Sequence, residues 1–379
     1  MAERVVNSAI EFAYASYDIE ADFKKELEKY FIYQNIVVVD ANFDFGLLYD
    51  KLERSTKCNF KRVKSIDQID NFENVDCMIV VNCCQIDKIK AICKRNSIPY
   101  IISLTKVCDI SNFKNCYFEN IKEIKSCNYP LGIMFDLNSV FNKNQFVSLA
   151  ILEVSSVCFD ITQKRLENLF FNNQIDYEYL ETEKNILKEL EKILEKRNEN
   201  IEKFAKKIAD LYLFYVITCV KDGFTMLDNL TILYKIANKK NVIEAKYLFR
   251  LIVSSLEKNF VEHYNAGLKD AIDYNAHERY LNAFGLSFDF KPLMLAETKI
   301  NYLLKEFKEK LLEYILLNIN FDKNIKAILA EIDIDFLYEM IFKFKHQTLT
   351  NYICLEPDIF KTPNFLKIMY QLGLLNFKI

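Results

Sequence analysis

Residues 75–103 read VDCMIVVNCCQIDKIKAICKRNSIPYIIS, and this stretch decides the fold. Residues 75–81 are almost continuously apolar and predict a buried strand. Residues 85–96 place apolar side chains at Ile86, Ile89 and Ile92, the spacing of a helix face. Residues 98–103 are apolar again and predict a second buried strand. A strand, a helix and another strand in this order indicate a parallel βαβ unit with both faces covered.

The same alternation continues on both sides of this unit. Residues 36–40 and 131–136 predict two further buried strands, and residues 45–53 predict a helix. We therefore expect residues 1–147 to form a nucleotide-binding-like α/β domain around a doubly wound, mostly parallel sheet. Ligands of such sheets bind at the carboxyl ends of the strands.

From about residue 145 the pattern becomes helical. Apolar residues from Leu180 to Ile208 follow three- and four-residue spacing and predict one long charged helix. Further helical stretches cover residues 242–258, 294–318 and 322–344. We expect residues 148–379 to form an all-helical domain.

Composition excludes several classes of function. Of the 379 residues 51% are hydrophobic and 14% aromatic, and the formal net charge is −3. These values exclude a disordered chain and a basic nucleic-acid footprint. No apolar run approaches the roughly 20 residues of a membrane span. The N-terminus shows no secretory signal, and the eleven cysteines contain no C-x-x-C pair, so we expect a cytoplasmic protein with reduced thiols and no membrane partner.

Two of the three histidines could form a metal site. His263 and His277 lie 14 residues apart on two predicted helices joined by a turn, which can bring both imidazoles to one point. An imidazole pair with one carboxylate is a common open site for Zn²⁺ or Fe²⁺. The alternative is that both histidines cap or pack helices.

Several segments, taken in order, resemble one superfamily. They are VVNCCQIDKIKA (residues 80–91), PYIISLTKVCD (99–109), PLGIMFD (130–136), EHYNAGL followed by HE (262–268 and 277–278), and HQTLTNY (346–352). Together they resemble the motifs of the iron-containing alcohol dehydrogenase and dehydroquinate synthase superfamily, and within it those of the sn-glycerol-1-phosphate dehydrogenases. The resemblance implies an N-terminal α/β domain followed by a helical domain, and a homodimer.

The resemblance also implies an activity and its residues. The activity is hydride transfer between NAD or NADP and a small-molecule substrate, a polyol or polyol phosphate, assisted by Zn or Fe. The implied residues are Asn82, Cys83, Asp87 and Thr105 for the cofactor, Asp109 for the substrate, and Glu153, His263 and His277 for the metal.

The sequence departs from the family pattern at the cofactor loop and at the metal site. Val81, Asn82 and Cys83 stand where the family has three glycines, although Asn tolerates a positive φ angle. Gly267 replaces a second histidine of the family segment. One alternative is a non-catalytic binding or scaffold relative that keeps the fold. Another is a metal-dependent carbocycle synthase or lyase related to dehydroquinate synthase, for which Glu153 speaks, although the synthase lysine is Ser156 here.

Overall fold

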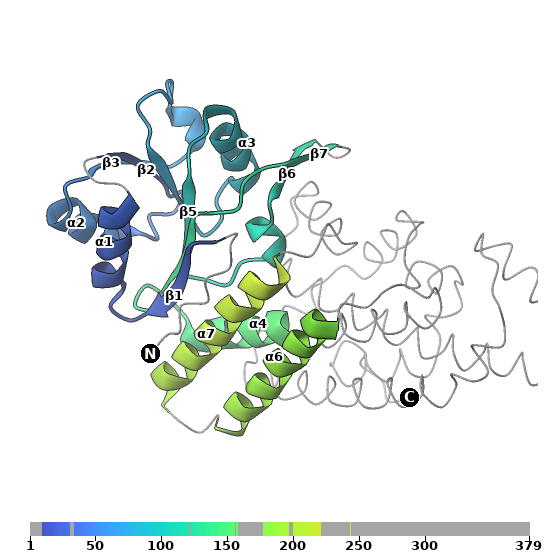
Figure 1. Ribbon diagram of the computed structural model, residues 1–379. Coiled ribbons are helices and arrows are strands. Elements are labelled where there is room, and N and C mark those ends of the chain that lie inside the picture. Colours follow the sequence, from blue (N-terminus) through green and yellow to red (C-terminus); the bar gives the residue numbers. More distant parts are fainter. Residues whose placement is uncertain are drawn as a thin grey trace, which may run out of the picture. The chain divides into compact units, whose positions relative to one another are not determined.

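A six-stranded parallel sheet organises the part of the chain that the structure describes (Figure 1). The structure is a computed structural model and describes residues 10–30, 34–120, 123–155, 157, 177–196, 200–220 and 243. The strands of the sheet lie in the order β1-β8-β5-β4-β2-β3, and β6 and β7 form a separate antiparallel hairpin.

The strands are β1 (Phe12–Ser16), β2 (Asn35–Val39), β3 (Asn59–Val63), β4 (Cys77–Val81), β5 (Tyr100–Leu104), β6 (Cys116–Asn120), β7 (Glu123–Ser126) and β8 (Gly132–Asp136). The α-helices are α1 (Ile19–Tyr30), α2 (Gly46–Ser55), α3 (Ile86–Asn96), α4 (Lys143–Ser155), α6 (Tyr177–Glu195) and α7 (Ile201–Cys219). Short 3-10 helices are η1 (Ile66–Gln68) and η2 (Ile110–Phe113).

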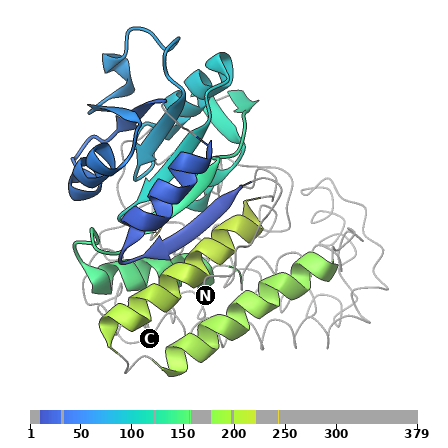
Figure 2. The same cartoon turned by 60° about the vertical axis from the view of Figure 1, so that its left-hand side comes forward.

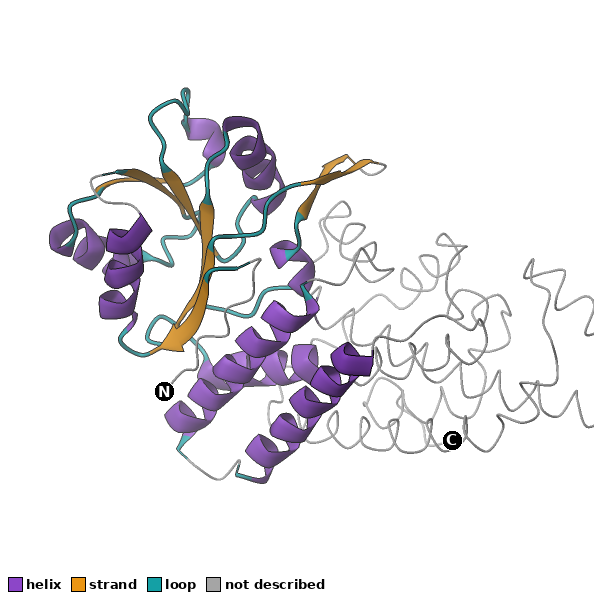
Figure 3. Ribbon diagram, in the orientation of Figure 1, coloured by secondary structure: helices purple, strands orange, loops and turns teal. Residues whose placement is uncertain are grey.

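Helices cover both faces of the sheet (Figure 3). Alternate strand residues such as Val38 and Ile79 form one core with the apolar faces of α1 and α2. The residues between them point to the opposite face, where the sulfur of Met78 lies 3.7 Å from that of Cys93 on α3. Because both faces are buried, the four central strands are almost continuously apolar and lack the alternation of a half-exposed strand.

The strand order creates one switch point. The chain leaves β2 through α2 to reach β3 on one side, and leaves β4 through α3 to reach β5 on the other side. The loops after β2 and β4 therefore diverge to opposite faces, as the positions of α2 and α3 in Figure 1 show. In open α/β sheets a ligand binds in the crevice between the carboxyl ends of two such strands.

The predicted α/β domain with a doubly wound parallel sheet is confirmed. The strands predicted at residues 36–40, 75–81, 98–103 and 131–136 are β2, β4, β5 and β8, and the helices predicted at 45–53 and 85–96 are α2 and α3. The edge strands β1 and β3 and the hairpin β6–β7 were not predicted.

The prediction of a single helix from Leu180 to Ile208 is wrong. Helix α6 ends at Glu195 and α7 begins at Ile201, so two helices occupy this stretch (Figure 2). Asn200 is the N-cap residue of α7. Its backbone is extended, with φ −51° and ψ 132°, and its side chain accepts a hydrogen bond from the amide of Glu202, which caps α7.

The chain divides into two compact units. The first consists of Met1–Ile151 and Glu189–Lys240 and contains the whole sheet. The second consists of Leu152–Lys188 and Asn241–Ile379. The domain boundary predicted between residues 147 and 148 stays a prediction. Within the described ranges, no helix combines the length and apolarity needed to cross a bilayer.

Candidate functional site at the carboxyl edge of the sheet

Polar side chains gather where β2, β4 and β5 end. Asp40 follows β2, Asn82 follows β4 and Thr105 follows β5. Since the three strands are neighbours and parallel, their carboxyl ends lie side by side along one edge of the sheet. The candidate site is therefore located at the switch point, which the order of strands alone would select.

The loop between β4 and α3 has a left-handed backbone although it contains no glycine. Its φ angles are 51° at Asn82, 56° at Cys83 and 51° at Gln85. This conformation costs an L-residue with a β-carbon about 1–2 kcal/mol, whereas glycine adopts it freely. The expectation that Asn82 serves a turn with positive φ is confirmed. The loop thus keeps a shape that glycines would favour while carrying side chains.

The carboxamide of Asn82 links the ends of three strands. Its Nδ2 donates to Asp44 Oδ2 at 2.8 Å and to Thr105 Oγ1 at 2.9 Å, and its Oδ1 accepts from the Thr105 amide at 2.8 Å. Asp44 belongs to the loop between β2 and α2, so the Asn82–Asp44 bond spans the switch point. Asn82 and Thr105, both predicted as cofactor residues, are in direct contact.

The side chain of Gln85, at the start of α3, bonds to residues that follow β3 and not to Asp44 or Thr105. Its Oε1 accepts from the Ile66 amide at 2.9 Å, and its Nε2 donates to Ser65 Oγ at 3.0 Å. Ser65 is the cap of η1, which follows the edge strand β3. These bonds hold the Gln85 side chain against the β3 end, away from Asn82, and so tie down the second side chain of the glycine-free loop.

Asp40 is buried and fully engaged. Its Oδ1 accepts from the Asp44 amide and its Oδ2 from the Phe45 amide, both at 3.0 Å. Arg62 Nη2 on β3 forms a salt bridge with Oδ2 at 2.5 Å. The guanidinium also lies 4.3 Å from the ring centroid of Phe43. Asp40 therefore organises the loop after β2 and fixes the position of Arg62.

The other predicted cofactor and substrate residues occupy different places. Cys83 and Asp87 are half-buried in the loop and in the first turn of α3. Burial raises the pKa of the adjacent Cys84 thiol, so it stays protonated at neutral pH. Asp109 is buried and caps η2, accepting hydrogen bonds from the Ser111 amide and hydroxyl. Its predicted role near a substrate stays a prediction.

Helix α7 anchors the segment that carries Thr105 and Asp109. The hydroxyl of the buried Tyr212 donates to the Cys108 carbonyl at 2.6 Å and accepts from the Cys108 amide at 3.3 Å. A helix 104 residues away in sequence thus holds the loop after β5. Periodicity identifies Tyr212 as a core residue but gives no sign of this bond.

The predicted metal site can be assessed at one of its three ligands. Glu153 lies on α4 and is 2% exposed, and the structure records interactions for it. Burying a carboxylate is costly unless other groups stabilise it, and the interactions of Glu153 supply such groups. His263 and His277, and with them their predicted convergence, lie outside the described residues. Within the described ranges, no three histidine, cysteine or acidic side chains are grouped to hold a metal ion.

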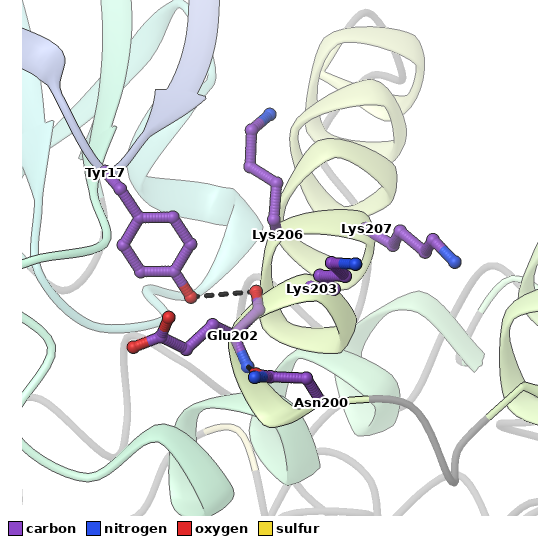
Figure 4. A pocket seen from close by; sticks show the side chains of 6 residues that line it. All are labelled: Tyr17, Asn200, Glu202, Lys203, Lys206 and Lys207. Atoms are coloured by element: carbon purple, nitrogen blue, oxygen red, sulfur yellow. Dashed lines mark hydrogen bonds between the residues drawn. The ribbon is translucent and has the colours of Figure 1, made fainter.

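A hollow of about 740 Å³ lies at the start of α7, beside the end of β1 (Figure 4). Tyr17 donates to the Glu202 carbonyl at 2.8 Å across it, and three lysines of α7 line it. In Figure 4 the side chains of Lys206 and Lys207 point apart, so their charges do not converge. Lys206 is also paired with Asp210.

Comparisons with known proteins give similarity in structure only. No family model matches the sequence, and no curated protein matches it significantly. Among solved structures, the iron-containing alcohol dehydrogenase of Thermotoga maritima superposes with a TM-score of 0.53 at 11% identity, over 95% of this chain and 97% of that one. Maleylacetate reductase of Agrobacterium tumefaciens gives 0.56 at 11% identity, over 95% and 98%. Glycerol dehydrogenase of Schizosaccharomyces pombe gives 0.55 at 12% identity, over 96% and 92%.

The chain has the fold of the iron-containing alcohol dehydrogenases. This agrees with the resemblance found in the sequence motifs, and it extends over nearly the whole length of the chains compared. Such low identities show the architecture alone. The chemistry must be argued from the residues at the carboxyl edge.

A left-handed turn leads into the N-terminus of α3, and backbone amides at a helix N-terminus can bind phosphate groups. The hydrogen bond from Asn82 to Asp44 joins the loops that follow β4 and β2 beside this turn. Sequence reasoning named Asn82 but missed Asp40, Asp44 and Arg62. An acidic residue directly after a buried strand was the available signal for Asp40.

Proposed function

We propose that the protein is an NAD(P)-dependent, metal-assisted oxidoreductase acting on a small polyol or polyol phosphate. The observation that carries this proposal is the left-handed loop at the switch point, which keeps the shape of a glycine loop despite Asn82, Cys83 and Gln85. A conformation that is unfavourable for these residues persists only where the surroundings enforce it, and such positions cluster at ligand sites. The known proteins of this fold named above include alcohol and glycerol dehydrogenases.

Under this proposal, residues at the carboxyl edge hold the cofactor. Asn82 orients Thr105 through two hydrogen bonds, and the backbone of Cys83 leads into the N-terminal turn of α3 with Asp87. The nicotinamide cofactor supplies hydride transfer when bound. Asp109 is the proposed substrate residue.

The proposed metal ligands are Glu153, His263 and His277. A divalent ion there would polarise the oxygen of the substrate alcohol or ketone. Glu153 is buried on α4 and is the one proposed ligand that lies among the described residues.

The test combines metal analysis with turnover. Purified full-length protein is assayed for bound Zn and Fe, and for oxidation of NADH and NADPH with dihydroxyacetone phosphate and with dihydroxyacetone. The variant His263→Ala should lose the metal and the activity, and His346→Ala serves as the matched control that keeps both. A protein without bound metal, whose two histidine variants behave like the wild type, contradicts the proposal.

A second candidate is a non-catalytic relative that keeps the fold, and one observation favours it. The Asn82 carboxamide joins Asp44 and Thr105 across the crevice that a dinucleotide would enter. Calorimetry with NAD, NADP and their reduced forms separates the candidates. A dissociation constant below about 100 µM, roughly −5.5 kcal/mol, contradicts a closed crevice.

A further inference from the structure

The acidic residue at the end of β2 is not available to a ribose. In dinucleotide-binding sheets a carboxylate near this point accepts the adenosine 2′-hydroxyl of NAD, and an arginine instead accommodates the 2′-phosphate of NADP. Here Asp40 is 1% exposed, and its two oxygens already accept from two backbone amides and from Arg62. Because this carboxylate is buried, a ribose hydroxyl could reach it only if the surrounding loop moved.

Cations and an aromatic ring gather beside Asp40 instead. The Arg62 guanidinium lies 4.3 Å from the ring centroid of Phe43, and Lys64 Nζ lies 4.8 Å from the same centroid. Lys64 is exposed and Arg62 is half-buried. Arg62 and Lys64 alternate along the end of β3, so both side chains leave the same side of the strand.

Phe43 is held in an unusual position. It is 51% exposed and has a φ angle of 60°, which is rare for a bulky residue. The two amide bonds to Asp40 fix the loop that carries it. The exposed ring offers a flat apolar surface beside the charge of Lys64 and beside Arg62, whose charge Asp40 balances, and this combination matches a purine next to a phosphate.

We propose that this edge, formed by Phe43, Arg62 and Lys64, selects the 2′-phosphorylated dinucleotide NADP(H) over NAD(H). The inference rests on the proposed function, because it names the cofactor of that same site. Arginine and lysine bind a dianionic phosphate through charge-assisted hydrogen bonds. The carboxylate of Asp40, which directly follows β2, is buried and paired with Arg62 and so does not face a 2′-hydroxyl.

Calorimetry on the full-length protein at one fixed salt concentration tests the inference. NADPH should bind at least about tenfold tighter than NADH, since a hydrogen bond to a charged group contributes about 1.5–3 kcal/mol. Lys64→Ala should reduce this ratio, mainly by weakening NADPH. Lys61→Ala, another exposed lysine of β3, is the matched control and should leave the ratio unchanged. Arg62 is unsuitable as the first variant, because its loss would leave buried Asp40 without its counter-ion.

The outcomes separate this inference from the proposed function. Three results would overturn the cofactor preference and leave the oxidoreductase proposal standing. They are equal affinities for NADPH and NADH, tighter binding of NADH, and an affinity ratio that Lys64→Ala and Lys61→Ala change to the same extent. Absence of binding of either dinucleotide up to about 1 mM, roughly −4 kcal/mol, overturns the proposed function and the preference with it.

Discussion

Replacing Asn82 by alanine tests whether its side chain stabilises the loop at the switch point. The variant loses the bonds to Asp44 Oδ2, Thr105 Oγ1 and the Thr105 amide. Two neutral hydrogen bonds contribute about 1 kcal/mol each, and the bond to a carboxylate contributes about 1.5–3 kcal/mol. Alanine also retains the unfavourable φ of 51° without the local hydrogen bonding of asparagine. The expected loss of stability is about 3–5 kcal/mol.

Asn82→Gly is the matched variant. Glycine loses the same three bonds but adopts the left-handed conformation without strain, so it should be about 1 kcal/mol more stable than alanine at this position. For a unit of this size, 1 kcal/mol shifts the melting temperature by about 2–4 °C. Thermal unfolding followed by circular dichroism should place alanine about 6–20 °C below the wild type, with glycine about 2–4 °C above alanine.

The order of the three melting temperatures tests both the Asn82 hydrogen bonds and the left-handed backbone at residue 82. Wild type above glycine above alanine supports both the bonds and the left-handed turn. An alanine variant as stable as the wild type would show that the Asn82 bonds contribute nothing. An alanine variant more stable than the glycine variant would refute a left-handed backbone at residue 82.

Three further predictions concern other parts of the first unit. Tyr212→Phe should lower the stability by about 1–2 kcal/mol in thermal unfolding, because the loop at Cys108 loses both bonds to the hydroxyl. Lys90→Met should destabilise by about 2–3 kcal/mol, since the buried ammonium donates to the carbonyls of Lys114 and Cys116 at 2.7 and 3.0 Å; unchanged urea midpoints would contradict this. Burial raises the pKa of Cys93 to about 12. The protonated thiol therefore contributes stability that is present below about pH 9 and is lost as the pH rises towards 12. Cys93→Ala should flatten the pH dependence of the melting temperature in that range.

The central strands could be predicted from the sequence, and the edge strands could not. Residues 77–81 of β4 are all apolar and all buried, so composition alone identifies the strand. At the edge, β3 reads NFKRV and only Val63 is fully buried. Five residues of mixed polarity give no usable periodicity, and β3 exists because it pairs with β2 along its whole length.

The break between α6 and α7 was missed for a related reason. Apolar residues on both sides of the break follow three- and four-residue spacing, so the pattern continues through it. The cap at Asn200 gives a weak sequence signal, because a capping box needs Glu or Gln three residues later and Lys203 stands there. Neither glycine nor proline marks the position.

The sequence identified only part of the candidate site. Its residues follow directly after strands, but their side chains form hydrogen bonds to residues that follow other strands. The resemblance of the sequence motifs implied Asn82 and Thr105 as cofactor residues. It could not show that Asn82 reaches Asp44, 38 residues away, or that Arg62 reaches Asp40, because both contacts depend on β2 lying between β3 and β4.

The strand order also explains how the loop can exist without glycines. Glycine would adopt the left-handed turn because it lacks a β-carbon. Asn82 adopts it because three bonds to the neighbouring strand ends stabilise the conformation that its own β-carbon disfavours. The same bonds draw the side chain towards Asp44 and across the crevice. One side chain therefore sets both the stability of the turn and the access of a ligand to it. Asn82→Gly should lower the stability of the turn and raise the access of a ligand.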